Sequence, residues 1–544
     1  MDATFRECYR TCVIGGALWM TAVVCGAQER ETAPVAPKLT EVYRSQFDKH
    51  VEVDRWSPVR AGQAPGGRRF LGEYSGSTPL VLRIDDLPEH RFIRLRADLL
   101  VLRSWDGLTK DLRPDTWGIN EVGGPLLLLT TFCNPMKRIP VAGEDPPPPL
   151  RVRHQCFPDE YPFALHDPAT GSSGKGGKLG IKFRDDLEAT NTIYEIDLVF
   201  PHTDKDLALR FFGRLTEGAS DESWALDNVV VEAVDRESPL DKKRLEELWG
   251  KLSGKDPVVG NTALWEIVGA GEAGRDFVLQ RWNEFLEPDP EKQEAPEVIA
   301  LRAKIEKILE RRGAEDFLTR QRAQKSLVDL DEDEVLDLLI EYEARNKDPE
   351  VALGLAAAID HQRKRRVKMA VNVHKNVVRS RVMHIGRIFE TRANDYRITS
   401  SPVKKPEHPF DEPGAAADGY VALASNHAAV PRWNWYPNRG TSEWLQYDFP
   451  RPRVISKADV AWYSAENSGS TSLPESWKVL YQDAAGNWKP VEHDGEYPVV
   501  PDQYNGVRFK PVTTKAVRLA VELKEGRSAG LHEFRVSNPP DKGR

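Results

Sequence analysis

The segment PRWNWYPNRG, residues 431–440, places aromatic and polar side chains side by side near two prolines. An aromatic face can stack on the apolar C–H face of a sugar ring, while neighbouring polar groups hydrogen-bond its hydroxyls. The stacking candidates are Trp433, Trp435 and Tyr436, and the hydrogen-bonding candidates are Arg432, Asn438 and Arg439. Alternatively, the tryptophans fill the end of a hydrophobic core. Exposure of both tryptophans beside Arg432 would favour binding, and burial would favour a structural role.

A second candidate for chemistry is the strand-like sequence EIDLVF, which starts at Glu195. Retaining glycosidases need two carboxylates about 5 Å apart, and a Glu-x-Asp-x-x-Glu strand can supply them. Glu195 and Asp197 are present, but Phe200 stands where the second catalytic carboxylate belongs. The chain also lacks an HExxH motif. We therefore expect a protein without a catalytic centre, or a degraded glycoside hydrolase.

Composition and charge are those of an ordinary soluble, multi-domain protein. A chain of 544 residues is too long to fold around one hydrophobic core, so we expect about three or four domains. The formal net charge of −8 disfavours nucleic-acid binding, which needs a dense basic face to displace counterions from phosphates. Nucleic acid is therefore not an expected partner.

The first residues are typical of an export signal. Arg6 and Arg10 precede an apolar run at 12–24, and Cys25-Gly26-Ala27 offers a cleavage site before Gln28. We expect residues 1–27 to be a signal peptide and the mature protein to be periplasmic, surface-bound or extracellular. Lipid anchoring at Cys25 is the alternative, and no later segment is apolar enough to span a membrane.

Two cysteines, Cys133 and Cys156, remain in the mature chain. In an oxidising compartment they can close one loop as a disulfide. The alternative is a pair of buried free thiols.

Patterning along the chain predicts three parts after a polar linker at 28–42. Residues 43–236 carry short apolar runs between turn signals, which indicates an antiparallel β-sandwich. Helical spacing follows at 238–385, with Ser238 as the first N-cap, and predicts a HEAT-like array. Residues 387–537 return to β character, and 538–544 form a polar tail.

Positive charge gathers at the end of the helical region. The run RKRRVK at 363–368 continues through Lys375, Arg379 and Arg381. It is a docking face for an acidic partner, such as an envelope protein, or an ordinary solvated helix face. His361, His374 and His384 lie nearby without acidic or cysteine partners at metal-ligand spacing, so we expect them to be surface or core residues.

The C-terminal part resembles the discoidin, or coagulation factor 5/8 type C, family of galactose-binding-like sandwiches. The likeness is closest to the C-terminal module of β-L-arabinofuranosidase-type glycoside hydrolases. It rests on PRWNWYPNRGTSEWLQYDF at 431–449, LPESWKVLYQD at 473–483, YNGVRFKPVTTKAVRLAVEL at 504–523 and GLHEFRV at 530–536. Most of the aromatic residues in these strands are expected in the core, namely Trp444, Tyr447, Phe449, Trp462, Trp477 and Trp488.

The same resemblance implies a structural Ca²⁺, a cation that needs several oxygen ligands. Asp418, in an ADG turn, and Glu533 are the candidate ligands.

The N-terminal part is similar to secreted bacterial jelly-roll and MAM-like modules, on the segments RSWDG at 103–107, RPDTWGI at 113–119 and SWALDNVVV at 223–231. This likeness implies that Asp227 binds a structural calcium, the alternative being an aspartate that caps a turn. Relatives carry serine at the position of Cys133, which makes a private Cys133–Cys156 bridge an expectation.

The sequence therefore predicts an exported, non-catalytic protein with a jelly-roll-like sandwich, a helical spacer and a discoidin-like sandwich that binds a glycan or glycoconjugate. The main alternative is an extracytoplasmic protein–protein scaffold.

Overall fold

The computed structural model describes most of the chain between residues 36 and 538. The described ranges are 36–48, 54–108, 114–138, 153–174, 179–184, 187–215, 217–286, 296–314, 316–330, 373–393, 397–403, 413–420, 424–427, 430–465 and 470–538, with scattered residues at 335–359 and at 422. The expected signal peptide, the basic run 363–368 and the tail from 539 lie outside these ranges.

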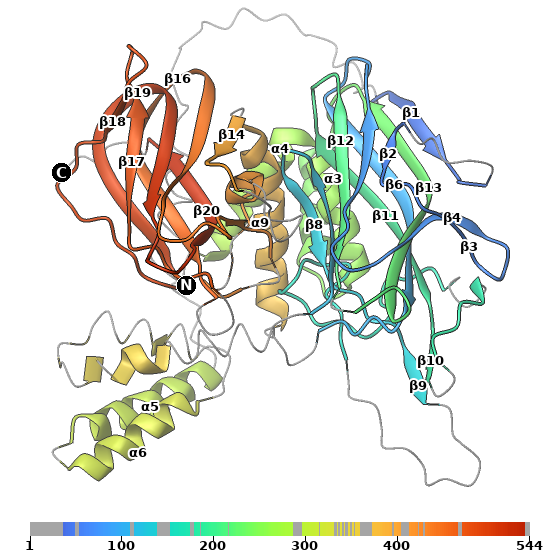
Figure 1. The fold of residues 1–544 in the computed structure, drawn as a ribbon. Helices are drawn as coiled ribbons and strands as arrows, with labels where there is room; N and C mark the ends of the chain where they lie inside the picture. The colour runs from blue at the N-terminus through green and yellow to red at the C-terminus, as the bar shows by residue number, and fades with distance from the viewer. Residues whose placement is uncertain are drawn as a thin grey trace, which may run out of the picture.

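The first part of the chain forms two antiparallel sheets that share a core (Figure 1). One sheet has the order β11-β6-β13-β4-β3, with β1 also paired to β13, and the other has the order β2-β5-β12-β7-β8. The strands are β1 (Leu39–Ser45), β2 (Trp56–Ser57), β3 (Ala61–Gln63), β4 (Arg69–Tyr74), β5 (Leu80–Ile84), β6 (Phe92–Arg103), β7 (Thr116–Glu121), β8 (Leu126–Thr130), β11 (Thr192–Pro201), β12 (Leu207–Arg214) and β13 (Glu222–Val234). A separate pair is made by β9 (Met136–Arg138) and β10 (Leu187–Ala189).

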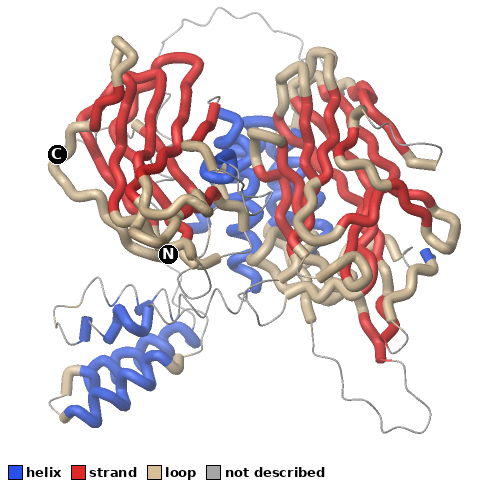
Figure 2. Tube along the Cα trace, in the orientation of Figure 1, coloured by secondary structure: helices blue, strands red, loops and turns tan. Residues whose placement is uncertain are grey.

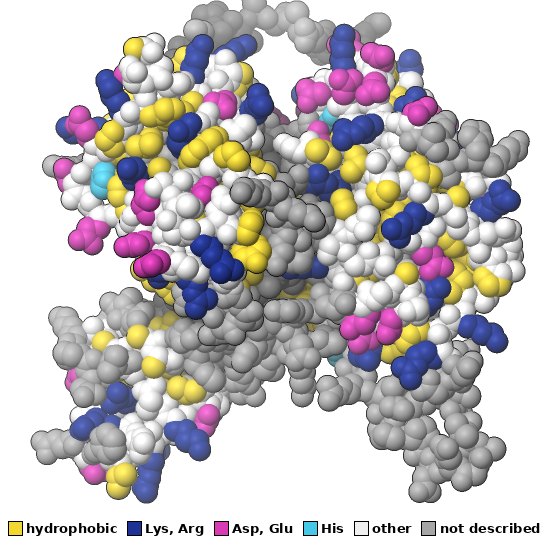
Figure 3. Space-filling model, viewed as in Figure 1, with side chains coloured by type: hydrophobic (Ala, Val, Ile, Leu, Met, Phe, Trp, Pro, Cys, Tyr) yellow, Lys and Arg dark blue, Asp and Glu magenta, His cyan; other side chains and the backbone are white. Residues whose placement is uncertain are grey.

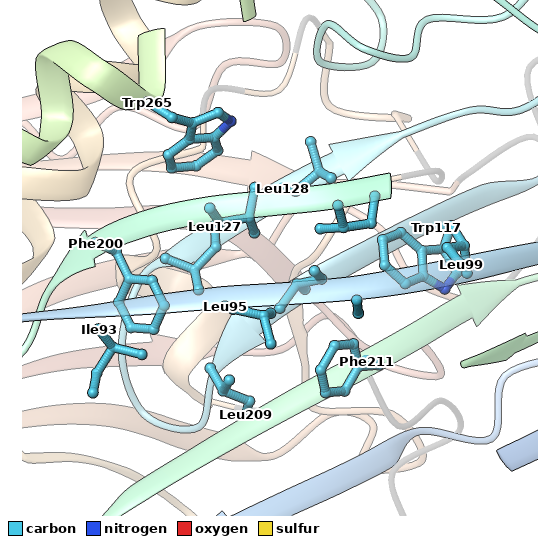
Figure 4. Packing of buried hydrophobic residues seen from close by; sticks show 14 of the residues in the cluster. Ile93, Leu95, Leu99, Trp117, Leu127, Leu128, Phe200, Leu209, Phe211 and Trp265 are labelled. Atoms are coloured by element: carbon cyan, nitrogen blue, oxygen red, sulfur yellow. The ribbon is translucent and has the colours of Figure 1, made fainter. Parts of the chain in front are cut away.

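Large aromatic side chains from both sheets meet in this core. Trp117 of β7 contacts Trp224 of β13 edge to face, with ring centroids 5.9 Å apart. Figure 4 shows Trp117 and Phe211 packed near Leu95 and Leu99, which come from the opposite sheet. The antiparallel sandwich expected at 43–236 is thus present and begins slightly earlier, at Leu39.

Four helices complete this N-terminal core instead of forming a spacer. They are α2 (Lys242–Leu252), α3 (Pro257–Gly269), α4 (Gly271–Leu286) and α9 (Val373–Ala393). Trp265 of α3 and Ile385 of α9 belong to the same buried cluster as the sandwich strands, and Figure 4 shows Trp265 above Leu127 and Leu128. The first helix is capped by Asp241, which accepts a hydrogen bond from the Arg244 amide, so Ser238 is not the N-cap.

The other helices form a separate cluster. α5 (Pro296–Arg312) packs on α6 (Phe317–Val328) and on the described residues at 335–359, with Ile305, Leu327 and Leu355 buried between them. This cluster lies apart from α3 and α9 in the ribbon and tube views (Figures 1 and 2). The described helices therefore fall into two groups, and a single HEAT-like stack is not what they form.

The C-terminal part is one antiparallel sheet folded into a second sandwich, with the order β15-β20-β16-β19-β17-β18 and β14 paired to β16. Its strands are β14 (Arg397–Ser400), β15 (Trp433–Asn434), β16 (Ser442–Tyr463), β17 (Ser476–Gln482), β18 (Trp488–Pro490), β19 (Tyr504–Glu522) and β20 (Gly530–Ser537), and a short 3-10 helix, η2, spans Pro413–Ala417. The helix α9 extends to Ala393, so this sandwich begins about ten residues later than the expected residue 387.

Buried ion pairs join α9 to a loop of the first sandwich. Arg381 donates to both carboxylate oxygens of Asp159, at 2.6 and 3.0 Å, and both side chains are almost fully buried. One turn and a half later, Arg387 is paired with Glu160. Because an unpaired charge in such a site is costly, these pairs fix how the helix sits on the loop. Arg381 is therefore not part of a docking face, contrary to the expectation for the basic run.

The same loop contacts the C-terminal sandwich. The Tyr420 hydroxyl donates to the Tyr161 carbonyl oxygen, and the His427 ring lies 3.2 Å from the Tyr161 hydroxyl. Tyr161 and Tyr420 belong to one buried cluster with Val377 of α9. Loop, helix and C-terminal sandwich are thus packed together.

Both cysteines are free, buried thiols in the structure, so the expected disulfide is not formed. The Cys156 thiol donates to the Ala164 carbonyl at 3.2 Å. Burial raises the pKa of each thiol, to about 12. A thiol in this state is a poor nucleophile.

Among the described residues, no helix combines the length and apolar character needed to cross a membrane.

Candidate functional site

The structure buries the two tryptophans predicted to stack on a sugar. Trp433 and Trp435 are 3% and 0% exposed, and their ring centroids lie 6.3 Å apart in the core of the C-terminal sandwich. The backbone of Trp433 pairs with Leu531 of β20, which draws the segment into the sheet. The prediction of exposed stacking faces is therefore wrong for both residues.

Arg432 is buried as well, at 4% exposure. Its guanidinium carbon lies 4.2 Å from the ring centroid of Tyr463, and one of its nitrogens donates to the Val430 carbonyl at 3.5 Å. A guanidinium stacked on a buried ring stabilises the fold and is not available to a solvent-borne sugar.

The remaining predicted residues stay at the surface. Tyr436 and Asn438 are partly exposed and Arg439 is exposed. The Arg439 guanidinium carbon lies 5.5 Å from the Tyr436 ring centroid, and the Asn438 amide donates to Glu443 Oε1 at 2.9 Å. We refer to Tyr436, Asn438 and Arg439 as the rim. It offers only one aromatic ring.

A different surface of this sandwich carries two tryptophans. Trp444 of β16, Trp488 of β18 and Arg518 of β19 are partly exposed on the outer face of the sheet. The Arg518 guanidinium carbon lies 4.3 Å from the ring centroid of Trp444 and 4.1 Å from that of Trp488. One cation therefore bridges two indole rings. Hydrophobic side chains are visible on the surface of this sandwich in Figure 3.

Hydrogen bonds hold the bridging cation in place. Arg518 donates through Nε and Nη2 to Gln446 Oε1, at 3.1 and 2.6 Å, and the Gln446 amide nitrogen donates to Asp448 Oδ1 at 2.7 Å. Partial burial lowers the pKa of Arg518, and the negative charge of Asp448 opposes that shift. We call Trp444, Gln446, Asp448, Trp488 and Arg518 the sheet-face cluster.

Strand alternation contained the signal for this cluster. Leu445, Tyr447 and Phe449 alternate along β16 and are buried. Trp444 lies one position out of phase with them, so its side chain must point to the opposite face. Trp444 and Trp488 were expected in the core and are instead partly exposed, whereas Trp462 and Trp477 are buried as expected.

The two calcium candidates of the C-terminal sandwich do come together. Asp418 and Glu533 are both buried, and the charge on Asp418 raises the pKa of Glu533 beyond the effect of burial. Burial raises the pKa of Asp418 to about 7. Glu533 Oε2 has no hydrogen-bond partner among the described residues, although Arg535 Nε lies 3.4 Å from Oε1. A buried carboxylate oxygen without a donor fits a Ca²⁺ ligand.

Asp227 has a different role from the one expected. Its Oδ2 accepts a hydrogen bond from Arg68 Nε at 2.6 Å, and its Oδ1 accepts one from the backbone N–H of Asn228 at 2.8 Å. Arg68 also pairs with Asp98 on the neighbouring strand. The carboxylate is thus occupied by an ion pair, and the calcium assignment for Asp227 is not supported.

The glycosidase-like strand shows no carboxylate pair in a cleft. Glu195 and Asp197 of β11 are exposed on the outer face of the first sandwich, and Asp197 is paired with Arg94 at 2.8 and 2.6 Å. Phe200 is completely buried. Of the candidate histidines, His384 is a core residue whose pKa burial lowers to about 4, while His361 lies outside the described residues.

Comparison with known families identifies the C-terminal sandwich. Residues 397–534 match the family model of the F5/8 type C domain, which confirms the resemblance found in the sequence. The match covers about a quarter of the chain.

Solved structures similar to this region include a chitosan-binding module, a β-galactosidase structure and a family 32 carbohydrate-binding module. A chitosan-binding module of a chitosanase/glucanase from Paenibacillus sp. IK-5 is 19% identical, with a TM-score of 0.21, and the match covers 27% of this chain and 96% of the module. A β-galactosidase structure from Streptococcus pneumoniae is 15% identical, with a TM-score of 0.23 and coverages of 27% and 99%. A family 32 carbohydrate-binding module from Clostridium perfringens, solved with galactose, is 15% identical, with a TM-score of 0.20 and coverages of 26% and 92%.

Proposed function

We propose that this chain is an exported, non-catalytic protein that binds a glycan or glycoconjugate through the sheet-face cluster of its discoidin-like sandwich. The observation that carries the proposal is the arrangement of Trp444 and Trp488 on either side of Arg518. Both rings are partly exposed, and the polar groups beside them can hydrogen-bond to sugar hydroxyls.

The chemistry of the cluster supports a neutral or anionic sugar. Gln446 contributes an amide and Asp448 a carboxylate, which are side chains that can pair with hydroxyl groups. Arg518 adds five N–H donors, and Gln446 Oε1 accepts only from its Nε and Nη2 groups. On β19, the neighbours on the same face are Ala516 and Ala520, which have small side chains.

The proposal includes a structural Ca²⁺ held by Asp418 and Glu533. When bound, the ion would neutralise two buried carboxylates and fix the turn at Gly419 against β20. We assign this ion a structural role and no role in sugar binding, because both side chains are buried.

The test is a glycan-array screen of the full mature chain, followed by calorimetry with the best-bound oligosaccharide. We expect Trp444→Ala to weaken binding at least tenfold, which corresponds to about 1.4 kcal/mol. Tyr436→Ala, on the rim, is the matched control and should bind like the unaltered protein. Equal binding by Trp444→Ala and the unaltered protein would contradict the sheet-face assignment.

The second candidate function is an extracytoplasmic protein–protein scaffold. Burial of Trp433 and Trp435 favours it, because the segment that looked most like a sugar site is structural. Failure of the unaltered protein to bind any oligosaccharide on the array would favour the scaffold over glycan binding.

A further inference from the structure

Three carboxylates converge at one edge of the N-terminal sandwich, away from the sheet-face cluster. Asp115 precedes β7, Glu217 lies in the turn after β12, and Glu222 is the first residue of β13. Each can offer an oxygen such that all three oxygens lie within 4.8 Å of one another. Like charges gathered this closely repel unless a proton or a cation separates them.

Burial makes this arrangement costly without a counter-charge. Asp115 and Glu222 are 4% and 2% exposed, whereas Glu217 is exposed to solvent. Glu222 Oε2 is buried and has no hydrogen-bond partner among the described residues. Native proteins rarely leave a buried carboxylate oxygen unsatisfied, because the lost hydration is then not replaced, and a bound cation can replace it.

Nearby cations are engaged elsewhere. Burial lowers the pKa of Arg153, and the negative charges of Glu222 and Asp221 oppose that shift. The Arg153 guanidinium is nevertheless paired with Asp106. Arg103 is paired with Glu73 and also donates to the Ser223 hydroxyl at 2.7 Å. Both guanidinium groups are thus committed to other carboxylates. The neighbouring Asp221 adds further negative charge, and burial together with Asp115 raises the pKa of Glu222 to about 10.

We propose that Asp115, Glu217 and Glu222 form a Ca²⁺ site. All three donors are hard carboxylate oxygens, which Ca²⁺ prefers, and the exposed side at Glu217 leaves positions for water to complete a shell of six to eight ligands. The chain offers no sulfur or imidazole ligand in this group, which disfavours Zn²⁺.

The position of the site gives the ion a structural role. Asp115 leads into β7 of one sheet and Glu222 begins β13 of the other, so a shared ion would tie the two sheets together at this edge. Trp117 and Trp224, which follow Asp115 and Glu222 by two residues each, make the edge-to-face contact between the sheets. The ion would therefore close the end of the core that these tryptophans fill.

Terbium provides a direct probe, because Tb³⁺ occupies oxygen-ligand calcium sites and luminesces when a nearby tryptophan is excited. The Trp105 indole donates to the Ser223 carbonyl at 2.8 Å, next to Glu222. We expect the full chain to show tryptophan-sensitised Tb³⁺ luminescence that Ca²⁺ displaces. Glu222→Gln should weaken this signal's apparent affinity at least tenfold, and Glu217→Gln should weaken it by a smaller factor.

Controls separate this site from the Asp418–Glu533 pair and from folding defects. Glu533→Gln should leave the luminescence at this site intact, and Asp197→Asn removes an exposed carboxylate of the same sandwich without effect. Calcium should raise the thermal midpoint of the unaltered protein but raise that of Glu222→Gln less. If Glu222→Gln fails to fold, Glu217→Gln, which changes an exposed residue, decides the question.

Two outcomes would overturn the proposal. One is that neither calcium nor a chelator changes the thermal midpoint of the Glu533→Gln protein. A proton shared between Asp115 and Glu222, and not a cation, would then separate the two carboxylates. The other is luminescence that neither Glu222→Gln nor Glu217→Gln weakens, which would place the ion elsewhere.

Discussion

The C-terminal sandwich uses tryptophan in two opposite ways. At residues 432–435, two indoles and an arginine are sealed inside, whereas in the sheet-face cluster two indoles and an arginine lie at the surface. Both regions combine the same residue types. What separates them is which face of the sheet the strand presents and whether another element covers that face, so composition alone does not identify a binding surface.

The largest expected effect is in the buried region. Trp435→Ala should lower the free energy of unfolding by about 3–5 kcal/mol, because it leaves a cavity where a fully buried indole packs. Urea denaturation followed by circular dichroism measures the change. A loss below about 1 kcal/mol would mean that Trp435 is not a core residue.

An intermediate effect concerns the buried face toward the first sandwich. Burial, assisted by the nearby charges of His532, Arg214 and Arg432, lowers the pKa of His427 to about 3 from an ordinary value of 6.5. The neutral imidazole is therefore favoured in the folded state. Its stabilising contribution is complete above pH 6.5 and is lost as the pH falls, because the unfolded chain then binds the proton first.

The corresponding measurement compares His427→Gln with the unaltered protein. The difference in unfolding free energy should shift in favour of the variant by about 2 kcal/mol when the pH falls from about 6.5 to about 4.5. Trp488→Ala, on the sheet face, should show a pH-independent difference from the unaltered protein. A pH-independent difference for His427→Gln would contradict the burial of this ring.

The smallest expected effect is in the sheet-face cluster. Arg518→Gln should lower the free energy of unfolding by only about 1 kcal/mol, the size of cation–π contacts at partly exposed sites. Lys510 is on the same strand as Arg518, and its exposed charge is paired with Glu492; Lys510→Gln serves as the control, with a change near zero. A loss as large as that of Trp435→Ala would show that the cluster is part of the core.

Local patterns predicted the strands well and their surroundings poorly. The alternation in EWLQYDF fixes which residues of β16 share a face, and it places Leu445 and Tyr447 on the core side. The helix α3 likewise carries a helical pattern whether it packs on another helix or on a sheet. Its assignment to the first sandwich depends on burial in one cluster with residues distant in sequence, as Trp265 and Leu127 are.

For the candidate sites too, local sequence patterns and contacts between distant residues determined different things. Asp418 and Glu533 could be paired beforehand because a family resemblance supplied their proximity. Nothing in the sequence alone brings Asp115 to Glu222, because they are more than a hundred residues apart and Asp115 precedes a strand of one sheet while Glu222 begins a strand of the other. Asp227 is the opposite case: the sequence suggested a calcium ligand, but its carboxylate is paired with Arg68, which lies just before β4.

By itself, the sequence determined the order of sandwich, helices and sandwich, and it determined the discoidin-like character of residues 397–534, because strand alternation and turn residues act over short distances. Only the tertiary structure decided that Trp433 and Trp435 are covered, that Arg381 is neutralised by Asp159, and that Cys133 and Cys156 stay apart as thiols. Burial and pairing arise from elements that meet across long stretches of chain, and a local pattern cannot specify its distant neighbour.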